Sequence, residues 1–140
     1  MATHQDAELI LRLYDLRREQ KMRTAREWFV KTVRAASLED FQKIAPPGSQ
    51  EHAYFRQVAS FWDMAAGFVV AGLIDPELFF QSNRELVLVW TRIQHIVEPI
   101  RKAHKDPTAY RNMEIVAKQF IGWMERQGPE CYSAFAERIK

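Results

Sequence analysis

Asp63 is the residue whose surroundings in the sequence most strongly suggest a chemical role. It lies between Trp62 and Met64 in the most apolar helical segment of the chain. A buried carboxylate without a partner is unfavourable by several kcal/mol, so we expect Asp63 to be bound by another polar group. The candidate partners are Arg56, Arg84 and Arg92. Two interpretations remain open, namely an interhelical ion pair or hydrogen bond, and a polar spot that lines a small-molecule pocket with Tyr54 and Trp90.

Other residues capable of chemistry are isolated in the sequence. His95 and Glu98 lie three residues apart on one predicted helix, but metal-binding bundles use repeated Glu-x-x-His pairs, and here the order is reversed and occurs once. Cys131 has no histidine nearby in the sequence and is expected to pack as a small apolar residue. No phosphate-binding loop, zinc-protease motif, nucleophile elbow or dinucleotide fingerprint occurs. The sequence therefore predicts no metal, no cofactor and no catalytic residue, and it favours a protein that is not an enzyme.

Basic residues are concentrated near the N-terminus, although the net charge of the chain is only +2. Residues 12–34 contain eight lysines or arginines and three acids. Such a segment could contact phosphates, but the acids are interleaved and no recognition-helix turn or aromatic stacking platform accompanies it. A solvated helix face is the simpler interpretation, and nucleic-acid binding remains the less favoured alternative.

Helical periodicity must position all of these residues, because no strand pattern is present. Apolar residues recur at intervals of three and four, and Gly, Pro and capping residues separate the periodic segments. We expect a first helix over about 4–36, which at about 1.5 Å per residue would be about 50 Å long. A domain of this size is only about 37 Å across, so this helix must bend or extend beyond the body. The further predicted helices are 37–44, 50–73, 76–104 with Pro99 inside it, 106–127, and a short one from Cys131.

The segment FVVAGLIDPELFF, residues 68–80, is predicted to form a corner between two helices. Its apolar run is about half the length of the roughly 20 residues that a membrane span needs. Asp75 is suited to cap the N-terminus of the following helix, and Pro76 fits the first helical position. Gly72 suits the end of the preceding helix. Asp75 and Pro76 are therefore predicted to be structural cap residues, and no transmembrane segment is expected.

The same corner carries a resemblance to a known family. The segments Y-F-x-x-V…G-L-I-D-P-E-L-F-F, L-V-W-x-R-I-x-x-I-V-E-P-I-R and D-P-x-A-Y-x-N-M-E-x-V-A, over about residues 53–126, resemble a bacterial helical family known only as a domain of unknown function. The resemblance implies a helical fold, no established activity and no catalytic residue to transfer. Some members carry an N-terminal membrane helix, where this chain has a charged amphipathic one.

Together these patterns predict an all-α protein, an antiparallel bundle of four long helices with short accessory helices, forming a single domain over residues 1–140. The leading functional hypothesis is a protein-interaction, scaffolding or regulatory module that forms a homo-oligomer through the long first helix. The alternatives are a small-molecule binder or enzyme around Asp63, and a nucleic-acid accessory protein. One cysteine and no recognisable signal peptide favour a cytoplasmic location.

Overall fold

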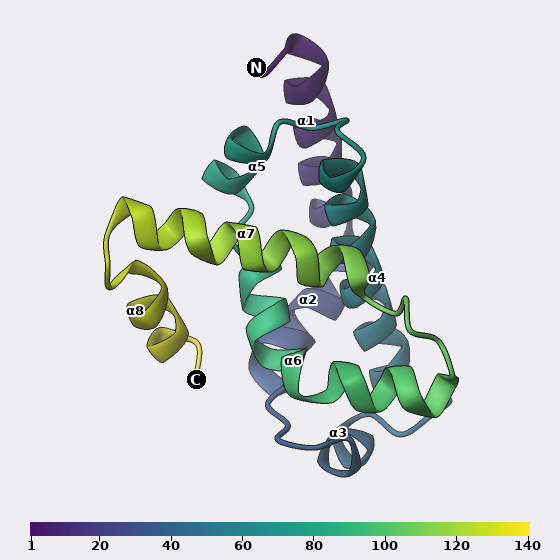
Figure 1. The fold of residues 1–140 in the computed structure, drawn as a ribbon. Helices are drawn as coiled ribbons and strands as arrows, with labels where there is room; N and C mark the ends of the chain where they lie inside the picture. The colour runs from purple at the N-terminus through teal and green to yellow at the C-terminus, as the bar shows by residue number, and fades with distance from the viewer.

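The computed structural model describes all residues 1–140 and contains helices but no strands, which confirms the all-α prediction. The helices are α1 (His4–Arg18), α2 (Gln20–Thr32), α3 (Leu38–Ile44), α4 (Gln50–Val70), α5 (Pro76–Ser82), α6 (Glu85–His104), α7 (Arg111–Gln127) and α8 (Cys131–Arg138). Helix α4 forms the centre and packs mainly against α2 and α7, while α7 crosses in front of α4 and α6 (Figure 1). None of the helices has both the length and the apolar character needed to cross a membrane.

Four of the helix starts predicted from a local capping residue are confirmed. The side chain of each such residue accepts a hydrogen bond from a backbone N–H three residues later, which satisfies one of the free donors of the first turn. These residues are Thr3, Ser37, Ser49 and Asp75. Pro76 occupies the first turn of α5, and Gly72 adopts a left-handed conformation with φ of 79°. The segment 68–80 therefore forms a corner between α4 and α5.

The segment predicted as one helix over 4–36 forms two helices, α1 and α2, so the bend that was one of the two outcomes expected from its length is present. The backbone breaks at Glu19, which has a ψ of 142°, and its carboxylate accepts from the N–H groups of Lys21 and Met22 at the start of α2. From α2, Arg26 reaches back and donates to the carbonyl of Arg17, 3.2 Å away, at the end of α1. A side chain thus replaces the helical hydrogen bonds lost at the break. Helix α2 also ends at Thr32 instead of residue 36.

The predicted helix over 76–104 is likewise two helices, α5 and α6. Asn83 is buried, and its Nδ2 donates to the carbonyl of Phe79 at 2.9 Å. In a continuous helix that carbonyl would accept from the backbone N–H of residue 83, so the asparagine side chain competes with the helix. Pro99 does not end α6, which continues to His104, but the helix changes direction along its length (Figure 1).

Helix α7 begins at Arg111, later than the Asp-Pro pair at 106–107 predicted. Asp106 instead forms a local turn, in which Oδ1 accepts from the backbone N–H and the hydroxyl of Thr108 at 2.9 and 2.6 Å. Tyr110 then adopts a left-handed conformation before the helix starts, and its side chain makes no cap hydrogen bond. The start of α7 therefore depends on a group from elsewhere in the chain.

Buried apolar residues from every helix form one core cluster, to which α4 and α6 contribute equally and more than any other helix. Trp62 of α4 is fully buried, and its ring meets Phe61 edge-on at 5.1 Å between centroids. Helices α4 and α7 approach closely at Gly67, where an added Cβ would lie 3.2 Å from Nδ2 of Asn112. This close contact places the start of α7 against the C-terminal part of α4.

Candidate functional site

Asp63 binds the backbone of another helix instead of an arginine. Its Oδ1 accepts from the N–H of Met113, in the first turn of α7, at 3.0 Å. Because Tyr110 supplies no side-chain cap, Asp63 provides from α4 the capping carboxylate that α7 lacks in its own sequence. Burial raises the pKa of Asp63, an effect opposed by the hydrogen bond from Met113 and by the charge of Arg101. The interhelical interpretation therefore describes this carboxylate.

The three arginines considered as partners of Asp63 have other roles. Arg92 donates to backbone carbonyls, and Arg84 contacts the Sγ of Cys131 at 3.8 Å. Arg56 forms no ion pair or side-chain hydrogen bond. The sequence could not identify the backbone partner by residue type. The only feature of the sequence that pointed to such a partner was the absence of a capping residue before Arg111.

Tyr54 and Trp90 do not join Asp63 in a pocket. Tyr54 lies nine residues before Asp63, which is about 13.5 Å along α4 and half a turn around it. Its ring packs near that of Trp28, at 6.0 Å, and it borders a shallow depression between α2 and α4. Trp90 is buried in the core cluster. Neither Asp63 nor Trp90 lines the depressions along α1, on α2, between α2 and α4, at the turn into α8, or where α2 and α8 meet α6.

Arg101 of α6 lies near Asp63 and binds groups at and before the start of α7. It donates to the carbonyl of Ala109 at 2.9 Å and forms an ion pair of the same length with Glu114. Glu98 lies 3.5 Å from Arg101, so it is directed away from His95, which borders a pocket next to α8. The structure contains no group of three or more potential metal-binding side chains. The arrangement around Asp63 joins α4, α6 and α7 and offers no reactive pair.

The Asp63 contact predicts a contrast between two substitutions. Asp63→Asn keeps an oxygen that can accept from Met113, whereas Asp63→Ala leaves that N–H without an acceptor and should lower the free energy of unfolding by about 1 to 2 kcal/mol. The folded pKa is raised, so the folded state holds this proton more tightly than the unfolded chain. The stability contributed by the native aspartate should therefore fall as pH rises from about 4 through the folded pKa.

Urea denaturation of the three proteins between pH 4 and pH 7 measures this effect. We expect Asp63→Asn to gain stability relative to the wild type as pH increases, because only the wild type must ionise a half-buried carboxylate. A wild type and an Asp63→Asn variant with the same pH dependence would show that Asp63 titrates as it does in the unfolded chain.

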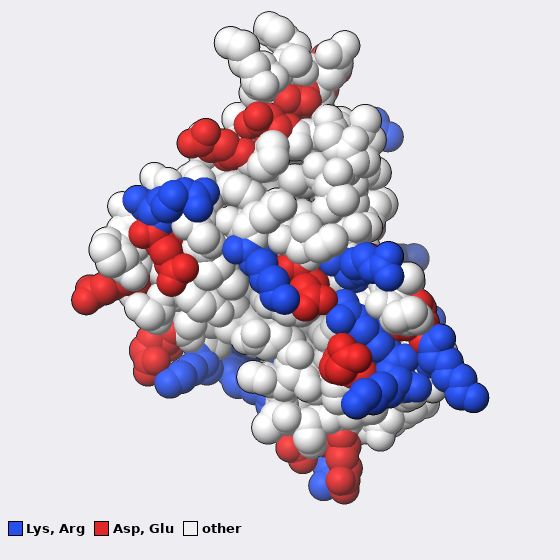
Figure 2. All heavy atoms as spheres, in the orientation of Figure 1, with Lys and Arg blue, Asp and Glu red and all other residues white.

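Some basic side chains of segment 12–34 form ion pairs within the fold and are not free on the surface. Arg17 and Arg26 both form ion pairs with Glu85 at the start of α6, and the guanidinium of Arg17 also lies over the rings of Tyr14 and Trp62 at 5.4 and 5.3 Å. On one face, lysines and arginines gather where α6 ends and α7 begins, with acidic side chains among them (Figure 2). The segment 12–34 therefore does not present its eight basic side chains as one free surface.

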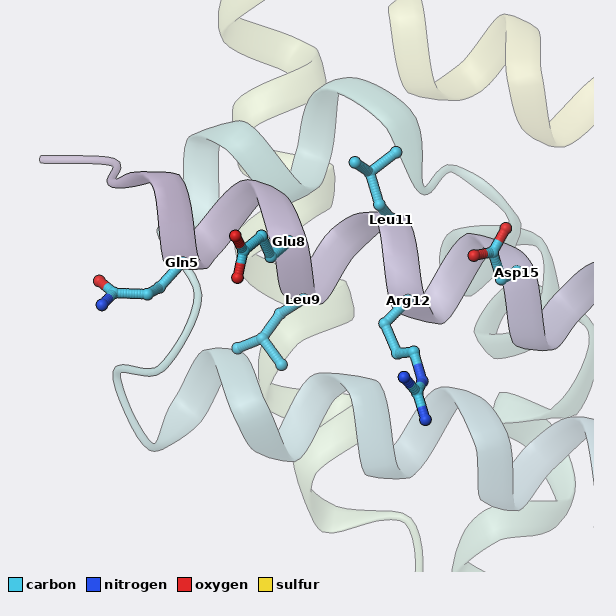
Figure 3. Close-up of a pocket in the computed structure, with 6 residues that line it drawn as sticks. All are labelled: Gln5, Glu8, Leu9, Leu11, Arg12 and Asp15. Carbon is cyan, nitrogen blue, oxygen red and sulfur yellow. The ribbon is translucent and has the colours of Figure 1, made fainter.

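Helix α1 has more exposed large apolar side chains than any other helix. Leu11 is 63% exposed and Leu16 45% exposed, and only Asp6 and Leu13 of α1 are buried. The N-terminal part of α1 stands out from the body (Figure 1). Along this helix runs an open groove, in which Leu11 projects from one side and Leu9 and Arg12 from the other (Figure 3). The groove is lined by Gln5, Glu8, Leu9, Leu11, Arg12 and Asp15.

Comparison with known proteins adds a family but no activity. No curated protein and no solved structure matches this chain. Residues 2–120 match the model of a family described as a domain of unknown function, DUF4760. The matched segment runs from the start of α1 into α7 and includes the corner at Asp75 and the contact between Asp63 and Met113, so the family resemblance is confirmed and extends to the N-terminal helices. The chain therefore belongs to the DUF4760 family.

Proposed function

We propose that the protein is an interaction module that binds a second copy of itself through α1. The observation that carries this proposal is the exposed groove-lining surface of α1, with Leu11 among the most exposed large apolar residues of the chain. Isolated exposed apolar residues are ordinary, but here they lie on a helix that stands out from the body and buries only two of its residues. A second copy would remove this surface from water.

The pattern of the groove supports a symmetric partner. Two copies of α1 that cross antiparallel about a twofold axis near residue 10 would bring matched side chains together, as an isologous interface requires. Glu8 would face Arg12 of the second copy, and the two Leu11 side chains would lie on the same side of the axis. Gln5 would face Asp15, an amide donor against a carboxylate. The lining residues thus include side chains of opposite charge that the axis would pair.

Charge reversal tests this pairing by sedimentation velocity at micromolar concentration. We expect the wild type to sediment as a dimer and Arg12→Glu to sediment mainly as a monomer, because the substitution sets two acids against each other on both sides of the axis. The double variant Glu8→Arg/Arg12→Glu restores the opposite charges and is expected to recover the dimer.

The matched control is Leu73→Glu, which adds an acid at the exposed corner after α4, a position that does not line the groove. It should leave the dimer intact, whereas Leu11→Glu should weaken it. A wild type that remains a monomer across this concentration range would overturn the proposal. A dimer that Arg12→Glu and Leu73→Glu weaken equally would place the interface elsewhere.

A further inference from the structure

A second open pocket lies where the ends of α2 and α8 meet the middle of α6. Its volume is about 400 Å³, within the range of small-molecule sites. The polar side chains that line it are Arg34, Thr91, Arg92, Gln94, His95 and Lys140. No aspartate or glutamate lines it, and four apolar side chains complete the wall. The lining is therefore basic and rich in hydrogen-bond donors.

Arg92 is the buried and firmly held polar side chain of this pocket. It is 8% exposed, and helix packing holds it in place through Nε and Nη1, which donate to carbonyls at the ends of α8 and α2. Its third nitrogen, Nη2, forms no hydrogen bond, yet it is not among the side-chain atoms fully enclosed by protein. A buried guanidinium with an unused donor that remains accessible from a pocket is a site for an acceptor.

The positive charge beside Arg92 is not neutralised by an acid. Arg34 makes one hydrogen bond, to the carbonyl of Lys31, and forms no ion pair. Burial and, to a smaller extent, the charge of Arg34 lower the pKa of Arg92, so the two guanidiniums repel each other. Lys140 is paired with Glu137 and adds little net charge. An anion placed between Arg34 and Arg92 would relieve this repulsion.

We propose that this pocket binds the phosphate or carboxylate group of a small molecule, held by Nη2 of Arg92 and the side chain of Arg34. Arginine suits both groups because its planar donors match their oxygens. Thr91 and Gln94 supply uncharged polar groups at the edge, and the alanines of the wall leave space for the remainder of the ligand. This site is separate from the groove of α1 and does not depend on self-association.

NMR titration of the whole chain tests the site with two probes, inorganic phosphate and succinate, each at constant ionic strength kept with chloride. We expect saturable shifts of backbone amides in residues 34–36, 91–95 and 136–140. The Arg34→Gln variant should bind about tenfold more weakly, as expected for the loss of a charge-assisted hydrogen bond. Arg23→Gln removes the same charge from an exposed position of α2 and should bind as the wild type does.

The titrations distinguish a phosphate ligand from a carboxylate ligand, and they also test whether the pocket binds an anion at all. Shifts with phosphate alone assign a phosphate-bearing ligand, and shifts with succinate alone assign a carboxylate. Phosphate or succinate should also raise the midpoint of thermal unfolding of the wild type more than that of Arg34→Gln. The proposal is overturned if neither probe shifts these amides in the millimolar range, or if Arg34→Gln and Arg23→Gln bind equally well.

Discussion

The Glu85→Gln variant should be about 3 to 5 kcal/mol less stable than the wild type, because it leaves two arginines without their shared carboxylate. The side chains of Glu85 and Arg17 are 12% and 13% exposed. Arg26 makes the closest contact, with its Nη2 2.7 Å from Oε2 of Glu85. Neutralising Glu85 therefore leaves positive charge that water cannot reach easily, at the point where α1 turns into α2.

Urea denaturation measures the change, and Glu27→Gln is its matched control. The side chains of Glu27 and Lys31 are 66% and 71% exposed, so the loss of this pair should change the free energy of unfolding very little. Because Arg26 also donates to the carbonyl of Arg17 at the end of α1, Glu85→Gln should increase amide hydrogen exchange in His4–Arg18 as well. Equal stability of the two variants would mean that Glu85 does not hold the bend together.

The Arg92→Met variant is expected to lose about 3 kcal/mol of stability, since methionine has a similar length but no hydrogen-bond donor. The carbonyl of Val30 at the end of α2 and that of Ile139 after α8 would each lose a charged donor. Arg92 also places a positive charge near the negative ends of both helices. The substitution should therefore loosen the contact between α2, α6 and α8.

Hydrogen exchange identifies where the Arg92→Met variant is weakened. We expect faster exchange throughout Cys131–Arg138, because α8 is short and depends on this contact. Arg92→Lys keeps the charge but has a single donor group, so its stability should lie between those of the wild type and Arg92→Met. If exchange in α8 remains at the wild-type rate, the end of α8 is held by its apolar residues alone.

Local signals in the sequence predicted most of the helices and their starts. Thr3, Ser37, Ser49 and Asp75 each act within three residues of their own position, so residue type alone identifies the cap. The break at Asn83 also has a local cause, since this side chain binds a carbonyl four residues earlier. The helical spacing of apolar residues continues across residue 83, however. For this reason the sequence pattern predicted one helix where the Asn83 side chain interrupts the backbone hydrogen bonds.

The break at Glu19 could not be predicted from the same rules. Residues 17–27 contain no Gly or Pro, and the i,i+4 spacing of Glu19 and Arg23 favours a continuous helix. The bend depends on Arg17 and Arg26 meeting Glu85, a residue 59 positions beyond Arg26 in the chain. Side chains that far apart are brought together only by packing of the whole protein, so tertiary structure selected the bent form.

At the candidate sites, residue type and apolar surroundings show which side chains need a partner, and the packing of the helices selects that partner. The apolar surroundings of Asp63 required a polar contact, but the partner is the backbone N–H of Met113. Arg92 similarly binds carbonyls of α2 and α8. Backbone groups occur at every residue and carry no side-chain identity, so only the packing of helices shows which of them a buried charge will meet.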